Sequence, residues 1–273
     1  MEIVYALLSG IIQGLTEFLP VSSSGHLVIL HNIFNFSLDS ELGFDVFLHL
    51  GSLVALILFF YKDIIKYLKA WFLSFKKWDL KNQVDQKLAW LLVLGTIPAA
   101  VFGYFLDDLI EQNLRSTLLV AIMLILVAIL FLIVEKFAKK TKNISTLNWK
   151  GSLAIGCAQA LALIPGTSRS GATIIIGMSF GLKRGEAARF SFLLSIPIVF
   201  AAGTKKMLDL FSAGFIKDEL LIYILGFIAA AIVGYLCIKY FLRFLEKYSL
   251  KAFAYYRIVL AGVLLILLLT NVI

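Results

Sequence analysis

The sequence is poor in charged residues and in cysteine, and both shortages narrow the class of protein. Only 15% of the 273 residues are charged, whereas 61% are hydrophobic and 14% are aromatic. The two cysteines, Cys157 and Cys237, lie far apart in apolar segments, which argues against a disulfide framework or a cysteine metal site. The opening Met1-Glu2 lacks a basic stretch, so no cleaved signal peptide is expected. Several apolar runs approach the ~20 residues that cross a bilayer, which indicates an integral membrane protein.

The positive charge of the chain is concentrated between its apolar runs. The formal net charge is +8. The loop 62–87 has seven lysines against three aspartates, 135–150 has five lysines against one glutamate, and 239–251 has four basic residues against one acid. Loops rich in lysine and arginine lie on the cytoplasmic side of a membrane. We therefore expect these stretches in the cytoplasm, both termini on the outer face, and membrane lipids rather than nucleic acid as partners.

Apolar runs of two lengths divide the sequence. Two regions, 3–34 and 151–182, each contain two runs that are too short to span a bilayer, and Pro20 or Pro165 breaks each region next to serine and glycine. Helices of this length reach only about 20–24 Å, so we expect two re-entrant helical hairpins. Such broken backbone is tolerated at membrane depth where it lines a cavity inside the protein. The six runs that are long enough to span lie at about 44–62, 87–106, 116–134, 186–204, 219–238 and 255–272.

The two halves of the sequence resemble each other. At an offset of 146 residues, Gly10, Gln13, Leu15, Ser22, Ser24 and Gly25 match Gly156, Gln159, Leu161, Ser168, Ser170 and Gly171. Each half is then one hairpin followed by three spans, and an odd number of crossings inverts the second half. We expect an all-α polytopic membrane protein with a single domain, 1–273, built from inverted repeats of about 1–134 and 151–272. Inverted repeats bring broken helices together near the midplane, where substrate sites form.

Two groups of polar side chains interrupt the apolar sequence. We name residues 17–26 the first polar turn and residues 165–173 the second polar turn. Charged groups at membrane depth cost several kcal/mol each unless they meet a partner. That cost favours one shared site, rich in hydroxyls and positive charge, of the kind that holds phosphate.

The first polar turn combines an acid, hydroxyls and an imidazole. Glu17 lies four residues after Gln13, so both side chains occupy one face of a short helix. His26 follows the turn and is a candidate base. The hydroxyls between Glu17 and His26 are candidate nucleophiles or phosphate ligands: Ser22, Ser23 and Ser24.

The second polar turn is cationic. Arg169 presents a planar fork of donors that suits phosphate oxygens. Backbone N–H groups at the start of the following helix point into the same space. Two simpler interpretations stay open: the hydroxyls cap or pack helices, and Arg169 forms a structural ion pair with Glu17. The hydroxyls concerned are those of Ser168, Ser170 and Thr173.

Both polar turns resemble the motifs of a known family, the bacterial undecaprenyl-diphosphatases linked to bacitracin resistance. Residues 13–26 are similar to its (Glu/Gln)-x-x-x-Glu motif running into Phe-Leu-Pro-(Val/Ile)-Ser-Ser-(Ser/Thr)-Gly-His, and residues 165–173 to its Pro-Gly-x-Ser-Arg-Ser-x-x-Thr motif. Some relatives have glutamate at the position of Gln13. Because this chain has glutamine there, Glu17 is the only carboxylate of its motif. The resemblance covers the whole chain.

The resemblance implies a hydrolase of the bacterial cytoplasmic membrane with its site open to the outer face. Its substrate is a C55 isoprenyl diphosphate, which it converts to the monophosphate to recycle a carrier lipid for peptidoglycan synthesis. For this reaction we expect Ser23 to attack the terminal phosphorus while His26, assisted by Glu17, takes its proton. An alternative makes His26 the nucleophile and Ser23 a phosphate ligand. With either nucleophile, we expect the phosphoryl oxygens to be held by Arg169, Ser168, Ser170, Thr173, Ser22, Ser24 and Gln13.

Cofactor and rival functions follow from the same residues. No organic cofactor is expected, and a divalent cation such as Mg²⁺ is compatible with the site, held by Glu17 and the diphosphate itself. The sequence is compatible with a homodimer but does not require one.

A transporter that flips polyprenyl phosphate is the competing function, because transporters share inverted repeats and midplane sites. The serine and histidine cluster beside Glu17 favours the enzyme. Acid-phosphatase chemistry needs a later histidine, and none follows His49.

Overall fold

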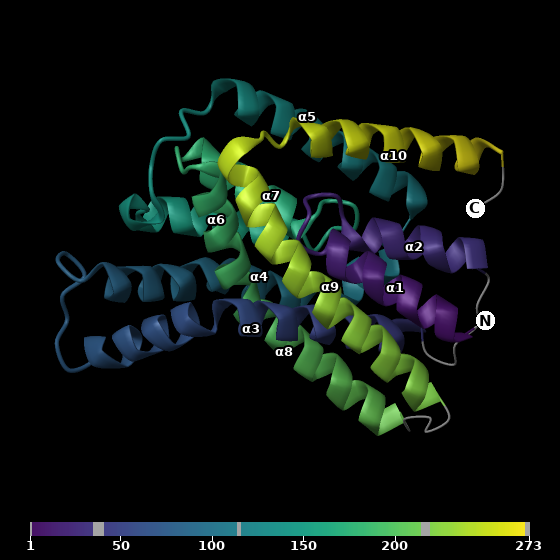
Figure 1. Cartoon of the computed structure of the whole chain (residues 1–273), viewed down its shortest axis with the longest axis horizontal. Helices are drawn as coiled ribbons and strands as arrows, with labels where there is room; N and C mark the ends of the chain where they lie inside the picture. Colours follow the sequence, from purple (N-terminus) through teal and green to yellow (C-terminus); the bar gives the residue numbers. More distant parts are fainter. Residues whose placement is uncertain (1, 35–40, 114–115, 214–218, 271–273) are drawn as a thin grey trace.

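The computed structural model describes residues 2–34, 41–113, 116–213 and 219–270, and its regular elements there are helices (Figure 1). A single bridge between Lys142 and Leu182 is the exception within these ranges. The helices are α1 (Glu2–Thr16), α2 (Ser23–Phe34), α3 (Glu41–Ser74), α4 (Val84–Asn113), α5 (Thr117–Phe137), α6 (Trp149–Leu161), α7 (Arg169–Ser179), α8 (Arg184–Ala213), α9 (Leu220–Lys247) and α10 (Lys251–Leu269), with a short 3₁₀ turn, η1, at Ile144–Thr146.

Six of these helices are long and apolar enough to cross a membrane. They are α3, α4, α5, α8, α9 and α10, and each overlaps most of one of the six spans predicted from the sequence. Helix α5 is the most apolar of the six, and the mean hydropathy of its apolar stretch is 3.4. The expectation of an all-α protein with six spanning helices is therefore confirmed.

The prediction that residues 62–87 form a loop is wrong, because α3 and α4 occupy most of this stretch. Helix α3 continues to Ser74, past a break in helical geometry at Phe60, where φ is −100° and ψ is 16°. Beyond this break Tyr67, Ala70 and Ser74 are buried, and their spacing places them on one helix face. The lysines between them made the segment look like a loop, but an amphipathic helix accommodates those charges on its exposed face.

The short helices form two pairs, and the first helix of each pair packs against the opposite half of the chain. Helix α1 packs on α2 and α9, whereas α6 packs on α7 and α4. In the first interface Gly10 lies against the Gly226 backbone, and in the second Gly156 lies against the Gly95 backbone, so closely that a Cβ at Gly10 or Gly156 would overlap it. Positions 10 and 156 are 146 residues apart, and positions 95 and 226 are 131 apart. The same glycine contact therefore occurs twice.

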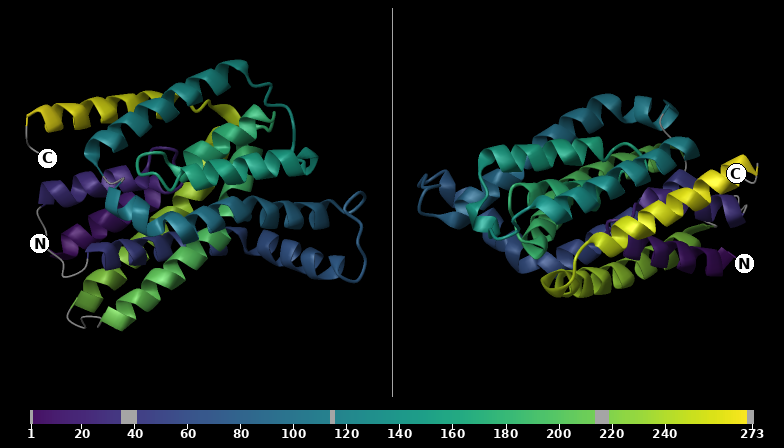
Figure 2. Two further views of the ribbon diagram at one scale, coloured as in Figure 1. Left: turned by 180° about the vertical axis from the view of Figure 1, so that it is seen from behind. Right: turned by 90° about the horizontal axis from the view of Figure 1, so that it is seen from above.

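The chain ends and the lysine-rich connection lie at opposite ends of the molecule. The start of α1 and the end of α10 lie together at one end, and the connection between α3 and α4 lies at the other (Figure 1; Figure 2). The polar turns that follow α1 and α6 lie between these ends, inside an apolar core. Phe18, next to Glu17, is fully buried and packs edge to face on Phe192, with the ring centroids 5.5 Å apart. This packing anchors the first polar turn.

Candidate active site

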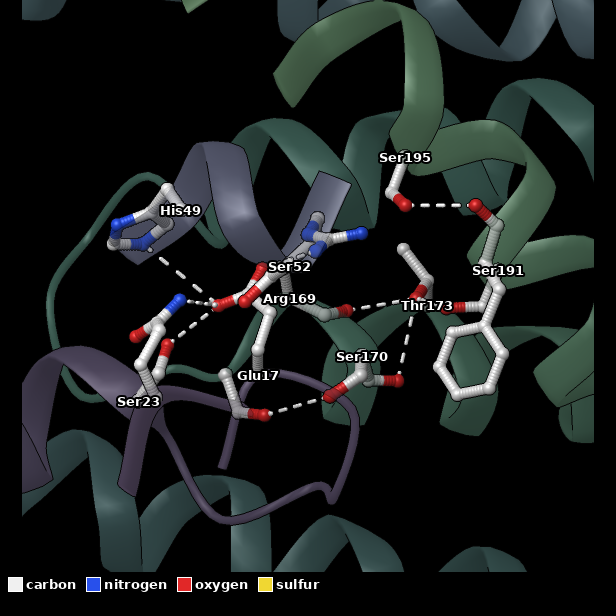
Figure 3. A network of polar contacts seen from close by, with 12 residues as sticks. Glu17, Ser23, His49, Ser52, Arg169, Ser170, Thr173, Ser191 and Ser195 are labelled. Carbon is white, nitrogen blue, oxygen red and sulfur yellow. Dashed lines mark hydrogen bonds and ion pairs between the residues drawn. The ribbon is translucent and has the colours of Figure 1, made fainter. Parts of the chain in front are cut away.

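Glu17 is the centre of the contacts between the two polar turns (Figure 3). Its Oε2 accepts hydrogen bonds from Ser23 Oγ at 2.8 Å and Gln13 Nε2 at 3.1 Å, and its Oε1 pairs with Arg169 Nη2. The side chains of Glu17 and Arg169 are only 8% and 15% exposed. The ion pair that the sequence left open therefore exists, and it holds the serine of one turn and the arginine of the other on a single carboxylate.

Both polar turns have the same local structure just before the next helix begins. Ser22 and Ser168 have φ values of 76° and 68°, a left-handed conformation that non-glycine residues adopt only where their surroundings enforce it. Ser22 Oγ accepts a hydrogen bond from Gly25 N at 3.4 Å, and Ser168 Oγ accepts one from Gly171 N at 3.2 Å. Both serines thus cap the helix that follows. The next residues, Ser23 and Arg169, occupy equivalent places.

The remaining hydroxyls have different surroundings. Ser24 is exposed, with its Oγ 3.2 Å from Ser22 Oγ. Ser170 Oγ donates to Leu19 O at 3.3 Å, which ties the second polar turn to the first. Thr173 is fully buried, and its hydroxyl lies 2.6 Å from Ser191 Oγ of α8 and donates to Arg169 O at 2.7 Å (Figure 3). Thr173 therefore supports the backbone of Arg169 and contacts α8.

His26 has partners other than Ser23 and Glu17. Its Nδ1 lies 2.7 Å from Ser22 O, and its Nε2 lies 2.6 Å from the hydroxyl of Tyr256 in α10. The two rings are stacked, with centroids 5.7 Å apart. Both ring nitrogens are thus engaged, and the hydroxyl of Ser23 donates directly to Glu17.

His49 of α3 is the imidazole beside Glu17. Its Nε2 lies 3.8 Å from Glu17 Oε2, and its Nδ1 lies 2.7 Å from Asp45 O, which holds the ring in place (Figure 3). Its side chain is 37% exposed, so it connects the buried carboxylate to the surroundings. The sequence places His49 inside the predicted span 44–62, but its contact with Glu17 depends on how α3 packs.

A buried arginine under the polar turns escaped the sequence analysis. Arg257 of α10 is fully buried and donates hydrogen bonds to Pro20 O of the first polar turn and to Gly166 O of the second. An ionisable residue inside an apolar spanning segment is by default a functional candidate. That signal was available in the run 255–272 but was not used.

Unpaired donors and acceptors remain at the centre of the site. Arg169 Nη1 and Gln13 Oε1 are buried without a hydrogen-bond partner among the described residues. A buried guanidinium N–H without an acceptor is costly, and a phosphoryl oxygen satisfies it. Within the described part of the chain, no cluster of three or more His, Cys, Asp or Glu side chains is placed to hold a metal ion.

Fold and site together define a multi-pass membrane protein with an internal, hydroxyl-rich and cationic site built from two broken helix pairs. A family model described as "Bacitracin resistance protein BacA" matches residues 6–263. The chain belongs to this family.

Curated relatives agree along nearly the whole chain. An "Undecaprenyl-diphosphatase" of Rubrobacter xylanophilus is 44% identical over 270 residues, covering 98% of this chain and 99% of the relative. An "Undecaprenyl-diphosphatase 2" of Stutzerimonas stutzeri is 42% identical over 270 residues, covering 98% of each. An "Undecaprenyl-diphosphatase 1" of Pseudoalteromonas translucida is 42% identical over 270 residues, covering 99% of this chain and 100% of the relative.

Proposed function

We propose that this chain is an undecaprenyl-diphosphatase, a membrane hydrolase that removes the terminal phosphate of a C55 isoprenyl diphosphate. The observation that carries the proposal is the bonding of Ser23 Oγ and Arg169 to one carboxylate, Glu17. This arrangement combines a nucleophile, its base and a cation for phosphate, and the relatives carry the same activity in their names. The chain thereby recycles the lipid carrier of peptidoglycan synthesis and confers bacitracin resistance.

In the first step, Ser23 Oγ attacks the terminal phosphorus and its proton passes to Glu17 Oε2, which is 2.8 Å away. The new Oγ–P bond forms as the bond from phosphorus to the bridging oxygen breaks, and undecaprenyl phosphate leaves with that oxygen. Direct transfer to Glu17 takes the place of the His26 relay, because both nitrogens of His26 already have other partners.

In the second step, water cleaves the phosphoserine. His49 takes a proton from the water, whose oxygen attacks phosphorus, and the Oγ–P bond breaks as Glu17 returns its proton to Ser23 Oγ, which restores both residues and releases inorganic phosphate. The exposed side of His49 provides the route by which the proton leaves. Arg169 offers Nη1 to the charge that develops on the phosphoryl oxygens in both steps.

A re-entrant arrangement of both helix pairs fits this chemistry. Helices α1 and α6 have 15 and 13 residues, about 20–23 Å at 1.5 Å per residue, which is shorter than the hydrocarbon core of a bilayer. The repeated glycine contacts and the repeated serine caps support two homologous halves in inverted orientation. With the lysine-rich connection in the cytoplasm, both termini face outward. The site then receives its substrate from the outer leaflet of the cytoplasmic membrane.

The proposal includes a cation and an assembly as secondary features. Glu17 and the diphosphate together would hold Mg²⁺, which commonly uses one or two carboxylates plus phosphate oxygens. It would neutralise charge on the bound diphosphate. A homodimer stays a prediction. Removal of divalent cations with a chelator, followed by an assay of phosphate release, tests the first feature.

Phosphate release by purified protein in detergent tests the function. With no membrane to cross, the enzyme should release inorganic phosphate from C55 diphosphate. A transporter of polyprenyl phosphate is the second candidate, supported by the repeated architecture. Absence of phosphate release in detergent, with movement of the lipid between leaflets in vesicles, would overturn the enzymatic proposal.

A further inference from the structure

Arg257 of α10 is a buried cation whose hydrogen bonds all go to backbone carbonyls. The residue is 0% exposed. Its Nε donates to Leu124 O at 3.2 Å, its Nη1 to Pro20 O at 3.3 Å, and its Nη2 to Met123, Gly166 and Thr167 O at 3.2, 2.9 and 3.2 Å. Within the part of the chain that the structure describes, Arg257 has no carboxylate partner. A charge at membrane depth in that situation is costly, so its retention calls for a specific role.

The five acceptors come from three different parts of the chain. Pro20 belongs to the first polar turn, Gly166 and Thr167 belong to the second, and the other two lie in α5. Helix α10 lies alongside α5 (Figure 1), so one guanidinium joins both turns to this pair of spanning helices. Gly166, with φ 88°, is pressed against α5 so closely that a Cβ would lie 2.6 Å from Val120 O.

The direction of these carbonyls affects the charge that a ligand meets. Each peptide unit is planar, with its C=O and N–H on opposite sides. Because Gly166 and Thr167 direct their oxygens to Arg257, the negative ends of these dipoles are paired with a cation. The guanidinium also adds a positive charge to the backbone of both polar turns, whose site contains the carboxylate of Glu17. Both effects favour a diphosphate.

We propose that Arg257 is a positioning residue that sets the relative placement of the two polar turns and makes the site selective for a phosphate dianion or diphosphate. It acts through the backbone and does not touch the reacting atoms. The preceding residue strengthens this link, because the Tyr256 hydroxyl contacts His26 at 2.6 Å. The inference rests on the proposed function for its substrate, but the binding of inorganic pyrophosphate tests it separately.

The test compares Arg257→Lys and Arg257→Gln with Arg243→Gln, a matched control at an exposed arginine of α9. Pyrophosphate affinity, kcat, KM and the thermal midpoint are measured for detergent-purified protein. Lysine keeps the charge, but its three donors sit on one nitrogen and cannot reproduce five hydrogen bonds made from three nitrogens of a planar fork. We expect its kcat to fall about tenfold or more, because misplacements near 1 Å cost up to about 100-fold. Pyrophosphate affinity should fall further in Arg257→Gln.

Three results would overturn the inference. The first is an unchanged kcat and pyrophosphate affinity in both variants. The second is a lower thermal midpoint with normal turnover per folded molecule. The third is failure of both variants to fold. Either of the last two results would make the role of Arg257 purely structural. If the wild-type protein binds pyrophosphate but releases no phosphate from the lipid, the proposed function fails while the affinity comparison still decides the role of Arg257.

Discussion

The two polar turns have nearly the same backbone and carry different chemistry. Ser22 and Ser168 both adopt positive φ and both cap the following helix. The next position holds Ser23 in the first polar turn and Arg169 in the second. Glu17 has Leu163 as its counterpart 146 residues later. A repeated frame therefore presents the proposed nucleophile and base from one side and the proposed phosphate-binding cation from the other.

This difference explains why one site forms in place of two. Glu17 bonds to both Ser23 and Arg169, whereas Leu163 cannot repeat either contact. Gln159, the counterpart of Gln13, is buried, and neither of its amide atoms has a hydrogen-bond partner among the described residues. The comparison predicts strong effects of changes at the unlike positions and small, similar effects at the like positions.

The largest effect is expected for Ser23→Ala. Removal of the nucleophile should reduce kcat by about 1,000-fold or more, with little change in the thermal midpoint because Ser23 is only partly buried. Phosphate release from C55 diphosphate measures this, with Ser179→Ala at the exposed end of α7 as the control. Full activity in Ser23→Ala would remove the nucleophile from the account.

Glu17→Gln comes next. The amide keeps the size of the side chain but cannot accept the proton of Ser23, and general-base catalysis contributes about 100- to 10,000-fold. We expect kcat to fall within that range while exposed Glu246→Gln has no effect. A variant that keeps more than half of the wild-type kcat contradicts the proton transfer to Glu17.

Arg169→Lys should lower kcat about 100-fold, since a single ammonium replaces the fork that faces both Glu17 and phosphate. The purified protein should remain folded and resist protease. If Arg169→Lys and Arg169→Ala both misfold, the ion pair with Glu17 is structural, and the second polar turn loses its proposed part in catalysis.

The smallest effects belong to the positions that the turns share. Ser22→Ala and Ser168→Ala each remove a helix cap, which costs about 1 kcal/mol of stability. We expect similar drops in thermal midpoint for the two variants. A loss confined to one of them would show that the two frames are not equivalent.

Local sequence predicted much of this molecule. The run 116–134 corresponds to α5, at Thr117–Phe137, and breaks near Pro20 and Pro165 separate the short helices. These features depend on hydrophobic length and on proline, which act within a few residues. The ion pair of Glu17 and Arg169 was one of the alternatives that the sequence left open, because a charge inside apolar sequence needs a partner.

Other features depend on contacts between distant segments. The engagement of His26 by Tyr256, the approach of His49 to Glu17 and the burial of the Thr173 hydroxyl against Ser191 all arise from helix packing. The sequence around each of these residues is compatible with several orientations. Local patterns therefore identified the polar residues of the two turns, but they missed Arg257 and did not show which side chains meet.

The central claim is that Ser23 and Arg169 act on the same phosphoryl group. A double-mutant cycle with Ser23→Ala, Arg169→Lys and the combined variant measures this through kcat/KM for C55 diphosphate. One shared site predicts that the combined loss is much smaller than the product of the two separate losses, because Arg169 has little left to stabilise once the nucleophile is gone. A combined loss equal to that product would mean that the two turns act independently, and the account would be contradicted.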